Sequence, residues 1–362
     1  MKLIFSGGGT GGHIFPAIAV ADEIRKKNKD VNILFVGAKG RIEEKIVPAN
    51  NYNLETISIS GFDKTKLYKN ILLPYKIFIA LKNCRQILKK FNPDAVIGTG
   101  GFASGPMVHS ALKLGIKTLI QEGNSYPGKV TRMLADKVDK VVISFEETKR
   151  YLKRNDNIIK ISYPVRESLK CINRDDANRK FGFDPTNKTL MIFGGSQGAS
   201  AINNALSGIF ERLYQKNINI LWQTGTKDFN EIQKRTREFT DKIKVTAFVN
   251  EMDIAYSASD LVVCRSGISS VMEIALLSKP AVFIPYPLAA DNHQEKNART
   301  IEKGDGCIVI LQSEVEAKLY DTITSLINNK DALSALGSNI HKFSDPGSAE
   351  KIAQEIFSLT KN

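Results

Sequence analysis

The sequence has few of the residues that build disulfide frameworks or structural metal sites. Only four cysteines occur in its 362 residues, at positions 84, 171, 264 and 307, and no two of them form a C-x-x-C pair. Zinc sites and disulfide scaffolds need paired or clustered cysteines, so both are disfavoured. Cys264 and Cys307 lie among apolar neighbours, and we therefore expect reduced, buried thiols, as in a cytosolic protein.

Long apolar runs, nucleic-acid signatures and aspartate pairs are lacking as well. No apolar run approaches the roughly 18 residues of a membrane-spanning helix, and the first one ends at once in glycines, so neither a span nor a secretory signal is expected. The absence of arginine-rich tracts and zinc-finger spacing disfavours nucleic acid as a partner. No D-x-D pair indicates a metal site, so the sequence requires no cofactor, although a divalent cation could assist without a motif.

The positive charge of the chain is concentrated in its first half. The net charge is +13; residues 1–163 contain 27 Lys and Arg against 14 Asp and Glu, whereas residues 164–362 contain 24 of each. A basic half favours an anionic partner, either a membrane surface or a phosphorylated substrate. The alternative is a basic surface that serves only solubility.

A glycine-rich loop follows the first predicted strand, at residues 1–6. Residues 7–12 are glycine except for Thr10, and a helix is predicted from about residue 14 to residue 27. The glycines match the G-x-G-x-x-G dinucleotide fingerprint, but that fingerprint also needs an acidic residue after the second strand, where Lys39 stands. We therefore expect a loop whose backbone approaches a ligand closely, with His13 at the helix start, rather than a nicotinamide site.

Strands alternate with helices along the whole chain, and the pattern restarts near residue 189. Two further glycine loops, at residues 98–106 and 194–199, each follow an apolar run and precede a helix, and the helix after the second loop is expected to run to Leu213. This pattern predicts an α/β fold of two doubly wound, Rossmann-like domains. Ligands of such folds bind outside the carboxyl ends of the strands, so both sets of loops are expected to face one interdomain cleft.

Residues 260–298 contain the most informative pattern. A valine-rich run at 261–264 predicts a buried strand, a tight turn with Gly267 follows, and residues 268–277 have helical spacing. Free N–H groups at such a helix start favour an anion, and Glu273 is placed to accept hydrogen bonds from two ribose hydroxyls. A second strand and a polar loop at 291–294 follow. The alternative is an ordinary crossover in which Glu273 is a surface carboxylate.

Three loops in this order resemble those of the MurG family of bacterial glycosyltransferases. They are residues 8–13 (GGTGGH), 194–199 (GGSQGA) and 264–273 (CRSGISSVME), and the resemblance covers nearly the whole chain. It implies a GT-B fold and inverting transfer of N-acetylglucosamine from UDP-N-acetylglucosamine to the 4-hydroxyl of undecaprenyl-diphospho-muramyl-pentapeptide. This reaction converts lipid I to lipid II in peptidoglycan biosynthesis. The implied domains are 1–163 plus a returning helix at 344–362 for the acceptor, and 164–343 for the UDP-sugar.

The resemblance also implies roles for individual residues. Those expected to contact UDP-N-acetylglucosamine are Thr10, Gly11, Gly12, Asn124, Arg166, Ser196, Val249, Ile268, Ser269, Ser270, Val271, Met272, Glu273 and Gln294. Among them, Val249 corresponds to a position that contacts uracil through its backbone, and Glu273 to one on the ribose hydroxyls. Histidine titrates near neutrality, so His13 could take the acceptor's proton or could only organise its loop. Glu122 is the next candidate base.

The sequence departs from the family pattern at two positions. Phe102 stands where members often have tyrosine, and His293 stands where a second glutamine commonly precedes Gln294. These departures concern the acceptor loop and the sugar end. Two other functions stay open: a GT-B enzyme with a different nucleotide sugar or lipid acceptor, and a non-catalytic nucleotide-sugar binder on a membrane surface. The presence of both His13 and Glu273 argues against the binder.

A helix predicted at residues 75–91 indicates a docking surface. Its expected inner face consists of Ile77, Ala80, Leu81, Cys84, Leu88 and Phe91. The apolar residues left outside that face or in the preceding loop include Ile71, Leu72, Leu73, Tyr75 and Phe78. Lysines surround them, which suits an anionic bilayer surface, so we expect peripheral binding on the cytoplasmic side of the cell membrane. The alternative is that the loop folds back and buries residues 71–73.

Overall fold

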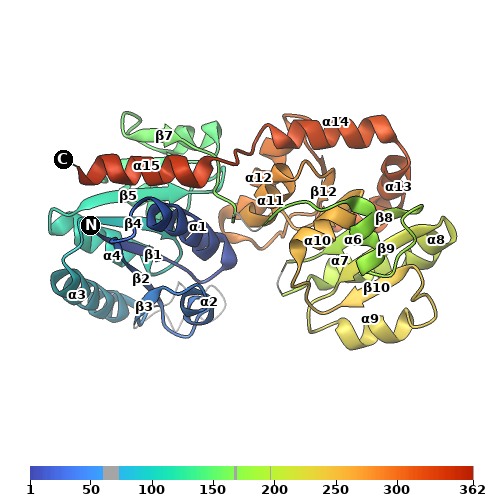
Figure 1. Cartoon of the computed structure of the whole chain (residues 1–362), viewed down its shortest axis with the longest axis horizontal. Helices are drawn as coiled ribbons and strands as arrows, with labels where there is room; N and C mark the ends of the chain where they lie inside the picture. Colours follow the sequence, from blue (N-terminus) through green and yellow to red (C-terminus); the bar gives the residue numbers. More distant parts are fainter. Residues whose placement is uncertain (60–72, 167–168, 196, 362) are drawn as a thin grey trace. The chain divides into compact units, whose positions relative to one another are not determined.

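The computed structural model describes residues 1–59, 73–166, 169–195 and 197–361, which form two compact units (Figure 1). Unit 1 comprises Met1–Arg166 and Asp345–Asn362, and unit 2 comprises Glu167–Ser344. Each unit contains its own parallel sheet with a reversal in strand order. The predicted α/β fold of two doubly wound halves is therefore confirmed.

The described part of unit 1 contains a seven-stranded parallel sheet in the order β3-β2-β1-β4-β5-β6-β7. Its strands are β1 (Lys2–Gly7), β2 (Asn32–Ala38), β3 (Asn53–Ile57), β4 (Ala95–Gly100), β5 (Lys117–Glu122), β6 (Lys140–Ile143) and β7 (Ile158–Lys160). The central strands are apolar because both of their faces are covered. The strand order reverses between β1 and β4, so the loops after these two strands lie side by side at the carboxyl edge.

Helices cover both faces of this sheet. The longer ones are α1 (Gly11–Lys27), α3 (Leu73–Phe91), α4 (Ser104–Lys113) and α15 (Ser348–Thr360). The shorter ones are α2 (Glu43–Ala49), α5 (Lys129–Leu134) and the 3-10 helix η2 (Glu146–Tyr151). α1 and α15 pack together over Leu3 and Phe5 on one face, and α3 and α4 pack over Ile4 on the other (Figure 1). The last helix thus completes the core of unit 1, although it follows unit 2 in the sequence.

The described part of unit 2 contains a six-stranded parallel sheet in the order β10-β9-β8-β11-β12-β13. Its strands are β8 (Lys188–Phe193), β9 (Ile218–Gln223), β10 (Ile243–Thr246), β11 (Leu261–Cys264), β12 (Ala281–Phe283) and β13 (Ile308–Val309). Its helices include α6 (Arg174–Lys180), α7 (Ser200–Ser207), α8 (Phe210–Gln215), α9 (Phe229–Arg235), α10 (Met252–Ala258), α11 (Ile268–Leu276), α12 (His293–Glu302), α13 (Val315–Ile327) and α14 (Lys330–His341). Here the order reverses between β8 and β11.

Two elements of unit 2 differ from the prediction. The single helix expected to run to Leu213 is divided into α7 and α8, because the chain leaves helical geometry at Ile209, after the weak helix former Gly208. The polar loop expected at 291–294 is shorter, because α12 already begins at His293. Asp291 and Asn292 both have left-handed φ angles, 52° and 55°, and this sharp turn replaces the loop.

The inner face of α3 was predicted only in part. Ala80, Cys84 and Leu88 are buried as expected, and Ile87 joins them, but the Ile77 side chain is 40% exposed. Residues 74–78 are all exposed and Ile79 is half-buried, so full burial along this helix begins at Ala80. Helical periodicity gives the phase of a buried stripe but not the turn at which packing begins.

Two further sequence expectations concern membrane spans and cysteines. No helix in the described ranges is long and apolar enough to cross a membrane. Cys264 and Cys307 are buried as predicted, as is Cys84, whereas Cys171 is exposed. Burial raises the pKa of the Cys84 thiol to about 12, so this group stays protonated at neutral pH.

Candidate active site

The carboxyl edge of the unit 1 sheet brings three loops together. They follow β1, β4 and β5, which are neighbours in the sheet. The reversal in strand order between β1 and β4 is the place where such sheets bind ligands. The predicted site residues on this edge are Thr10, Gly11, Gly12, His13, Glu122 and Asn124.

Some glycines of the first loop are needed where it packs against the second glycine loop, whereas another leaves its backbone open to a ligand. A Cβ atom at Gly101 would lie 2.1 Å from the Gly8 carbonyl oxygen, and one at Gly7 would lie 2.1 Å from Thr99 Oγ1. Close contact between the two loops therefore requires glycine at these positions. Gly9 differs, because it has a φ of 84° and no described atom within 4 Å of its Cβ position. The expected close approach of a ligand thus fits Gly9 best.

The His13 ring is fixed by the second glycine loop. Its Nδ1 lies 3.0 Å from the Thr99 carbonyl oxygen, and Thr99 Oγ1 donates to the His13 carbonyl oxygen at 2.8 Å. A carbonyl oxygen can only accept, so Nδ1 carries a proton. In the neutral ring Nε2 then holds the lone pair, which is the form a general base requires.

Glu122 holds the loop after β5 in place. Its Oε1 accepts from the backbone N–H and side-chain amide of Asn124, at 3.0 and 3.1 Å. Its Oε2 accepts from the Gly128 N–H at 2.8 Å and the Thr131 hydroxyl at 2.7 Å. The carboxylate is 6% exposed. Four donors on one buried carboxylate fix the position of Asn124 and the start of α5.

The end of unit 1 contacts the helix that carries His13. The Tyr163 hydroxyl donates to the Gly12 carbonyl oxygen at 2.9 Å. The Arg166 guanidinium lies 5.2 Å from the centre of the Phe15 ring, on the same helix. The predicted nucleotide residue Arg166 therefore belongs to unit 1 and stacks on α1.

In unit 2 the loops after β8 and β9 contact each other through glycines. A Cβ atom at Gly198 would lie 2.1 Å from the Thr224 carbonyl oxygen. The buried Gln223 links this pair to a third segment, because its amide donates to the Gly195 carbonyl oxygen at 3.0 Å and accepts from the Val249 N–H at 2.9 Å. The predicted uracil contact Val249 is thus tied to the glycine loop through its N–H group.

The start of α11 presents backbone donors beside the point where the strand order reverses. Ile268, Ser269 and Ser270 form its first turn, and the first N–H groups of a helix have no acceptor inside it. The Val271 N–H already donates to the Gly267 carbonyl oxygen at 3.0 Å, and the Val271 and Met272 side chains are buried. Among residues 268–272, the backbone N–H groups of the first three are therefore best placed to bind an anion.

Glu273 is half-buried on α11 and accepts a hydrogen bond from the Tyr256 hydroxyl, Oε2 to Oη 3.1 Å. Tyr256 itself is fully buried, and its ring packs edge-on against Phe193, 6.1 Å between ring centres. The buried tyrosine thus holds one oxygen of the carboxylate in place. It argues against a freely solvated surface side chain.

Gln294 and Ser266 join the starts of two helices. The Ser266 hydroxyl donates to the Gln294 carbonyl oxygen at 2.8 Å, and Gln294 Oε1 accepts from the Tyr286 N–H at 3.0 Å. The preceding residue, Arg265, is buried at 8% exposure. Its guanidinium donates to the Ile284 and Pro285 carbonyl oxygens and to Gln312 Oε1. Burial lowers the pKa of Arg265, yet guanidinium remains protonated in proteins. Its positive charge is held between the loop after β12 and Gln312.

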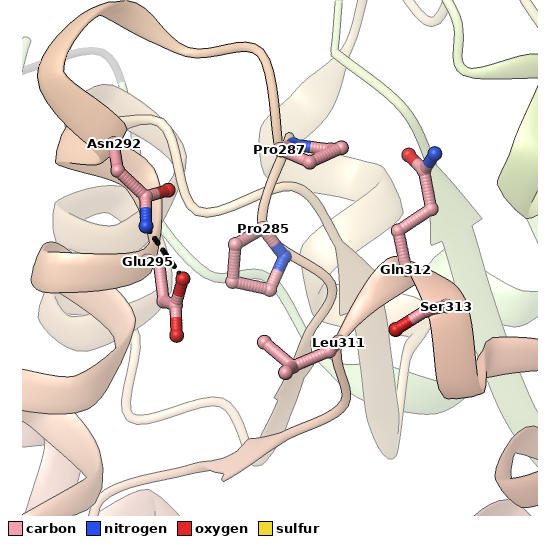
Figure 2. Close-up of a pocket in the computed structure, with 7 residues that line it drawn as sticks. All are labelled: Pro285, Pro287, Asn292, Glu295, Leu311, Gln312 and Ser313. Atoms are coloured by element: carbon pink, nitrogen blue, oxygen red, sulfur yellow. Dashed lines mark hydrogen bonds between the residues drawn. The ribbon is translucent and has the colours of Figure 1, made fainter.

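A pocket of about 300 Å³ lies in unit 2, around the turn that precedes α12 (Figure 2). Its lining residues are Pro285, Pro287, Asn292, Glu295, Leu311, Gln312 and Ser313. Figure 2 shows the Asn292 amide hydrogen-bonded to Glu295, a contact of 2.6 Å. None of the predicted site residues lines this pocket, so it is adjacent to the predicted donor contacts rather than formed by them.

Comparison with known proteins decides the family. Models of the glycosyltransferase family 28 N-terminal and C-terminal domains match residues 3–143 and 189–352. The UDP-N-acetylglucosamine–N-acetylmuramyl-(pentapeptide) pyrophosphoryl-undecaprenol N-acetylglucosamine transferase of Phocaeicola vulgatus is 38% identical over 99% of this chain and 96% of that protein. Its counterpart in Flavobacterium psychrophilum is 38% identical over 100% of this chain and 98% of that protein. The chain belongs to the MurG family.

A solved structure agrees with the MurG assignment and with the GT-B fold. The crystal structure of MurG from Acinetobacter baumannii matches with a TM-score of 0.78 and 26% identity, over 99% of both chains. The match spans both units, so neither half of the MurG architecture is missing from this chain.

Several expectations for a MurG-family site fall outside what the structure describes. Ser196, Ile71 and Leu72 lie outside the described residues, as does the side chain of Leu73. Across the ranges that are described, no group of three or more His, Cys, Asp or Glu side chains could hold a metal ion.

Two residues that tie together the loops of the candidate site were missed by sequence reasoning. Gln223 ends an apolar strand and Glu43 begins a short charged helix, and neither stands in a glycine motif. The backbone contacts that make them important join segments 26 to 34 residues apart. No local pattern marks such contacts.

Proposed function

We propose that this chain transfers N-acetylglucosamine from UDP-N-acetylglucosamine to the 4-hydroxyl of undecaprenyl-diphospho-muramyl-pentapeptide, the step from lipid I to lipid II. The observation that carries this proposal is the full-length identity of 38% to transferases with that name. The loops described above supply the chemistry that the reaction requires: a proton acceptor in unit 1, and anion and ribose contacts in unit 2.

The proposed reaction is a single inverting displacement. The acceptor 4-hydroxyl oxygen attacks the anomeric carbon, the bond from that carbon to the β-phosphate oxygen breaks, and UDP departs with the electron pair. His13 Nε2 takes the hydroxyl proton, since Nδ1 is occupied by the Thr99 carbonyl. The four donors on Glu122 favour a positioning role for it over that of the base.

The departing diphosphate is stabilised by fixed donors. The N–H groups of residues 268–270 and the buried Arg265 provide positive potential where negative charge develops. Glu273 accepts from the ribose hydroxyls, and the Val249 carbonyl contacts the base. Gln294 lies at the sugar end. This mechanism uses no cofactor, and a divalent cation remains compatible with it.

The decisive assay measures transfer of labelled N-acetylglucosamine with and without lipid I. We expect labelled lipid only when lipid I is present, and no inhibition by excess UDP-glucose. Equal use of UDP-glucose would indicate a GT-B enzyme with another donor. Binding of UDP-N-acetylglucosamine without transfer to any lipid would indicate a non-catalytic binder.

We further propose that unit 1 docks on the anionic cytoplasmic face of the cell membrane through α3. Tyr75 and Phe78 are 65% and 64% exposed. Lys82, Arg85 and Lys89 are exposed and continue the same helical stripe, because positions 75, 78, 82, 85 and 89 recur at heptad spacing. An apolar tip followed by basic side chains suits an interface where headgroups are anionic.

The docking surface predicts an effect on vesicle flotation. The double variant Tyr75→Ser/Phe78→Ser should lose flotation with phosphatidylglycerol vesicles, and high salt should weaken flotation of the unmodified protein. Met133→Ser is a matched control, because that side chain is also highly exposed, at 69%, on another helix of unit 1. Unchanged flotation of the double variant would place the contact elsewhere, and loss of UDP binding would mean that these residues support the fold.

A further inference from the structure

Glu43 is a buried carboxylate that the mechanism above does not use. It is the first residue of α2, and its side chain is 0% exposed. Its Oε2 accepts from the Gly9 N–H at 2.8 Å, and its Oε1 accepts from the Ala38 N–H at 2.9 Å. An apolar side chain here would leave both of these backbone N–H groups without their acceptor, so the carboxylate ties the loop after β1 to the end of β2.

The backbone around Glu43 is shaped to receive its carboxylate. A Cβ atom at Gly8 would lie 2.2 Å from Glu43 Oε1, and one at Gly37 would lie 2.5 Å from Glu43 Cγ. Gly8 has a φ of 145° and Gly9 a φ of 84°, which side chains rarely adopt. The loop after β1 and the end of β2 thus both lack side chains where the carboxylate lies.

The opposite side of this loop contacts the second glycine loop. A Cβ atom at Gly101 would overlap the Gly8 carbonyl oxygen, and one at the neighbouring Gly100 would lie 2.5 Å from His13 Nδ1. The Gly8–Gly9 backbone is therefore held between Glu43 on one side and the loop that fixes the His13 ring on the other. Thr10 and the start of α1 follow directly.

We propose that Glu43 is a positioning residue for glycosyl transfer. Its carboxylate fixes the backbone of Gly8 and Gly9, and through it the placement of His13 toward the acceptor hydroxyl. The proposal rests on the proposed function, because it assigns Glu43 to the acceptor half of that reaction. Glu43 contacts no reacting atom and acts only through the loop.

The test compares Glu43→Gln with Glu44→Gln. Both remove one negative charge from the first turn of α2, but Glu44 is exposed and accepts from the nearby Gly40 N–H, at 2.9 Å. The glutamine oxygen can still accept from one backbone N–H, but its NH2 group cannot accept from the other, so one of the two loop bonds is lost. We expect Glu43→Gln to lower kcat by about 10- to 100-fold, as for a small misplacement of reacting groups. The KM for UDP-N-acetylglucosamine and the Kd of UDP should stay within about twofold of the values for the unmodified enzyme. A residue that only positions reacting groups affects kcat and leaves binding of the donor unchanged. Glu44→Gln should behave like the unmodified enzyme.

A second variant keeps the proposal testable if Glu43→Gln does not fold. Gly37→Ala leaves the charge intact but displaces the carboxylate through its Cβ atom, and it should produce the same loss of kcat with the same donor KM. A folded Glu43→Gln or Gly37→Ala enzyme with the kcat of Glu44→Gln would overturn the proposal. A rise in donor KM as large as the fall in kcat would overturn the proposal too, because it would indicate a general structural effect of the substitution. Failure of the unmodified protein to use lipid I would instead refute the proposed function.

Discussion

Replacement of His13 with asparagine should lower kcat for transfer to lipid I by about 10²- to 10⁴-fold, the usual contribution of a positioned general base. The asparagine amide nitrogen can take the place of Nδ1 and still donate to the Thr99 carbonyl oxygen, which now lies 3.0 Å from the ring. The variant therefore removes the proton acceptor while it keeps the bond that organises the loop. His13→Ala removes both.

The two variants together separate a catalytic from a structural role. If His13 is the base, asparagine and alanine lose similar amounts of kcat, and the acid limb of the pH–rate profile disappears in both. If His13 only organises the loop, asparagine restores most of the activity that alanine loses, and the acid limb remains. His109→Ala is a matched control, because His109 is a second half-buried histidine of unit 1, on α4. UDP affinity should be unchanged in all three variants.

The sequence was sufficient to predict the two sheets because their strands are parallel and buried. β8 and β11 are apolar along nearly their whole length, which is the pattern of strands covered on both faces. The glycine loops then mark the carboxyl ends of β1, β4 and β8 and hence the edge where ligands bind. Strand order could be inferred only through the family, since periodicity carries no information on which strands pair.

The contacts that shape the site could not be predicted in the same way. Glu43 follows Ile42 in a stretch with alternating charges, where a solvated carboxylate is the ordinary expectation. Only the tertiary fold brings its carboxylate within hydrogen-bond distance of the Gly9 N–H. Ile77 shows the converse case, because its position in the helical period predicts burial whereas α3 extends past the layer it packs on. Whether such a residue is buried or exposed depends on where its helix lies relative to the rest of the fold, which local sequence does not show.

Glycine motifs have a related ambiguity. Gly7, Gly8 and Gly101 are needed where loop backbone approaches other protein atoms, whereas Gly9 lies open. A sequence motif does not distinguish these two needs. The interpretation that the first loop approaches a ligand therefore applies to part of the motif, and the rest serves the contact between two loops.

The second large effect is expected for Glu273. Glu273→Ala should weaken UDP binding at least about tenfold, because a hydrogen bond to a charged acceptor contributes about 1.5–3 kcal/mol and two ribose hydroxyls lose their partner. Isothermal titration calorimetry measures this directly. The Tyr256 hydroxyl, which donates to Glu273 at 3.1 Å, orients the carboxylate, so Tyr256→Phe should weaken UDP binding by less than Glu273→Ala.

An altered ligand shows whether the ribose itself is the partner of Glu273. The unmodified protein should bind 2′-deoxy-UDP more weakly than UDP, whereas Glu273→Ala should bind the two with nearly equal affinity. A folded variant that still discriminates between them as strongly as the unmodified protein would show that Glu273 does not contact the ribose. Its bond to Tyr256 would then account for the carboxylate, and the loss of UDP affinity should be no greater in Glu273→Ala than in Tyr256→Phe.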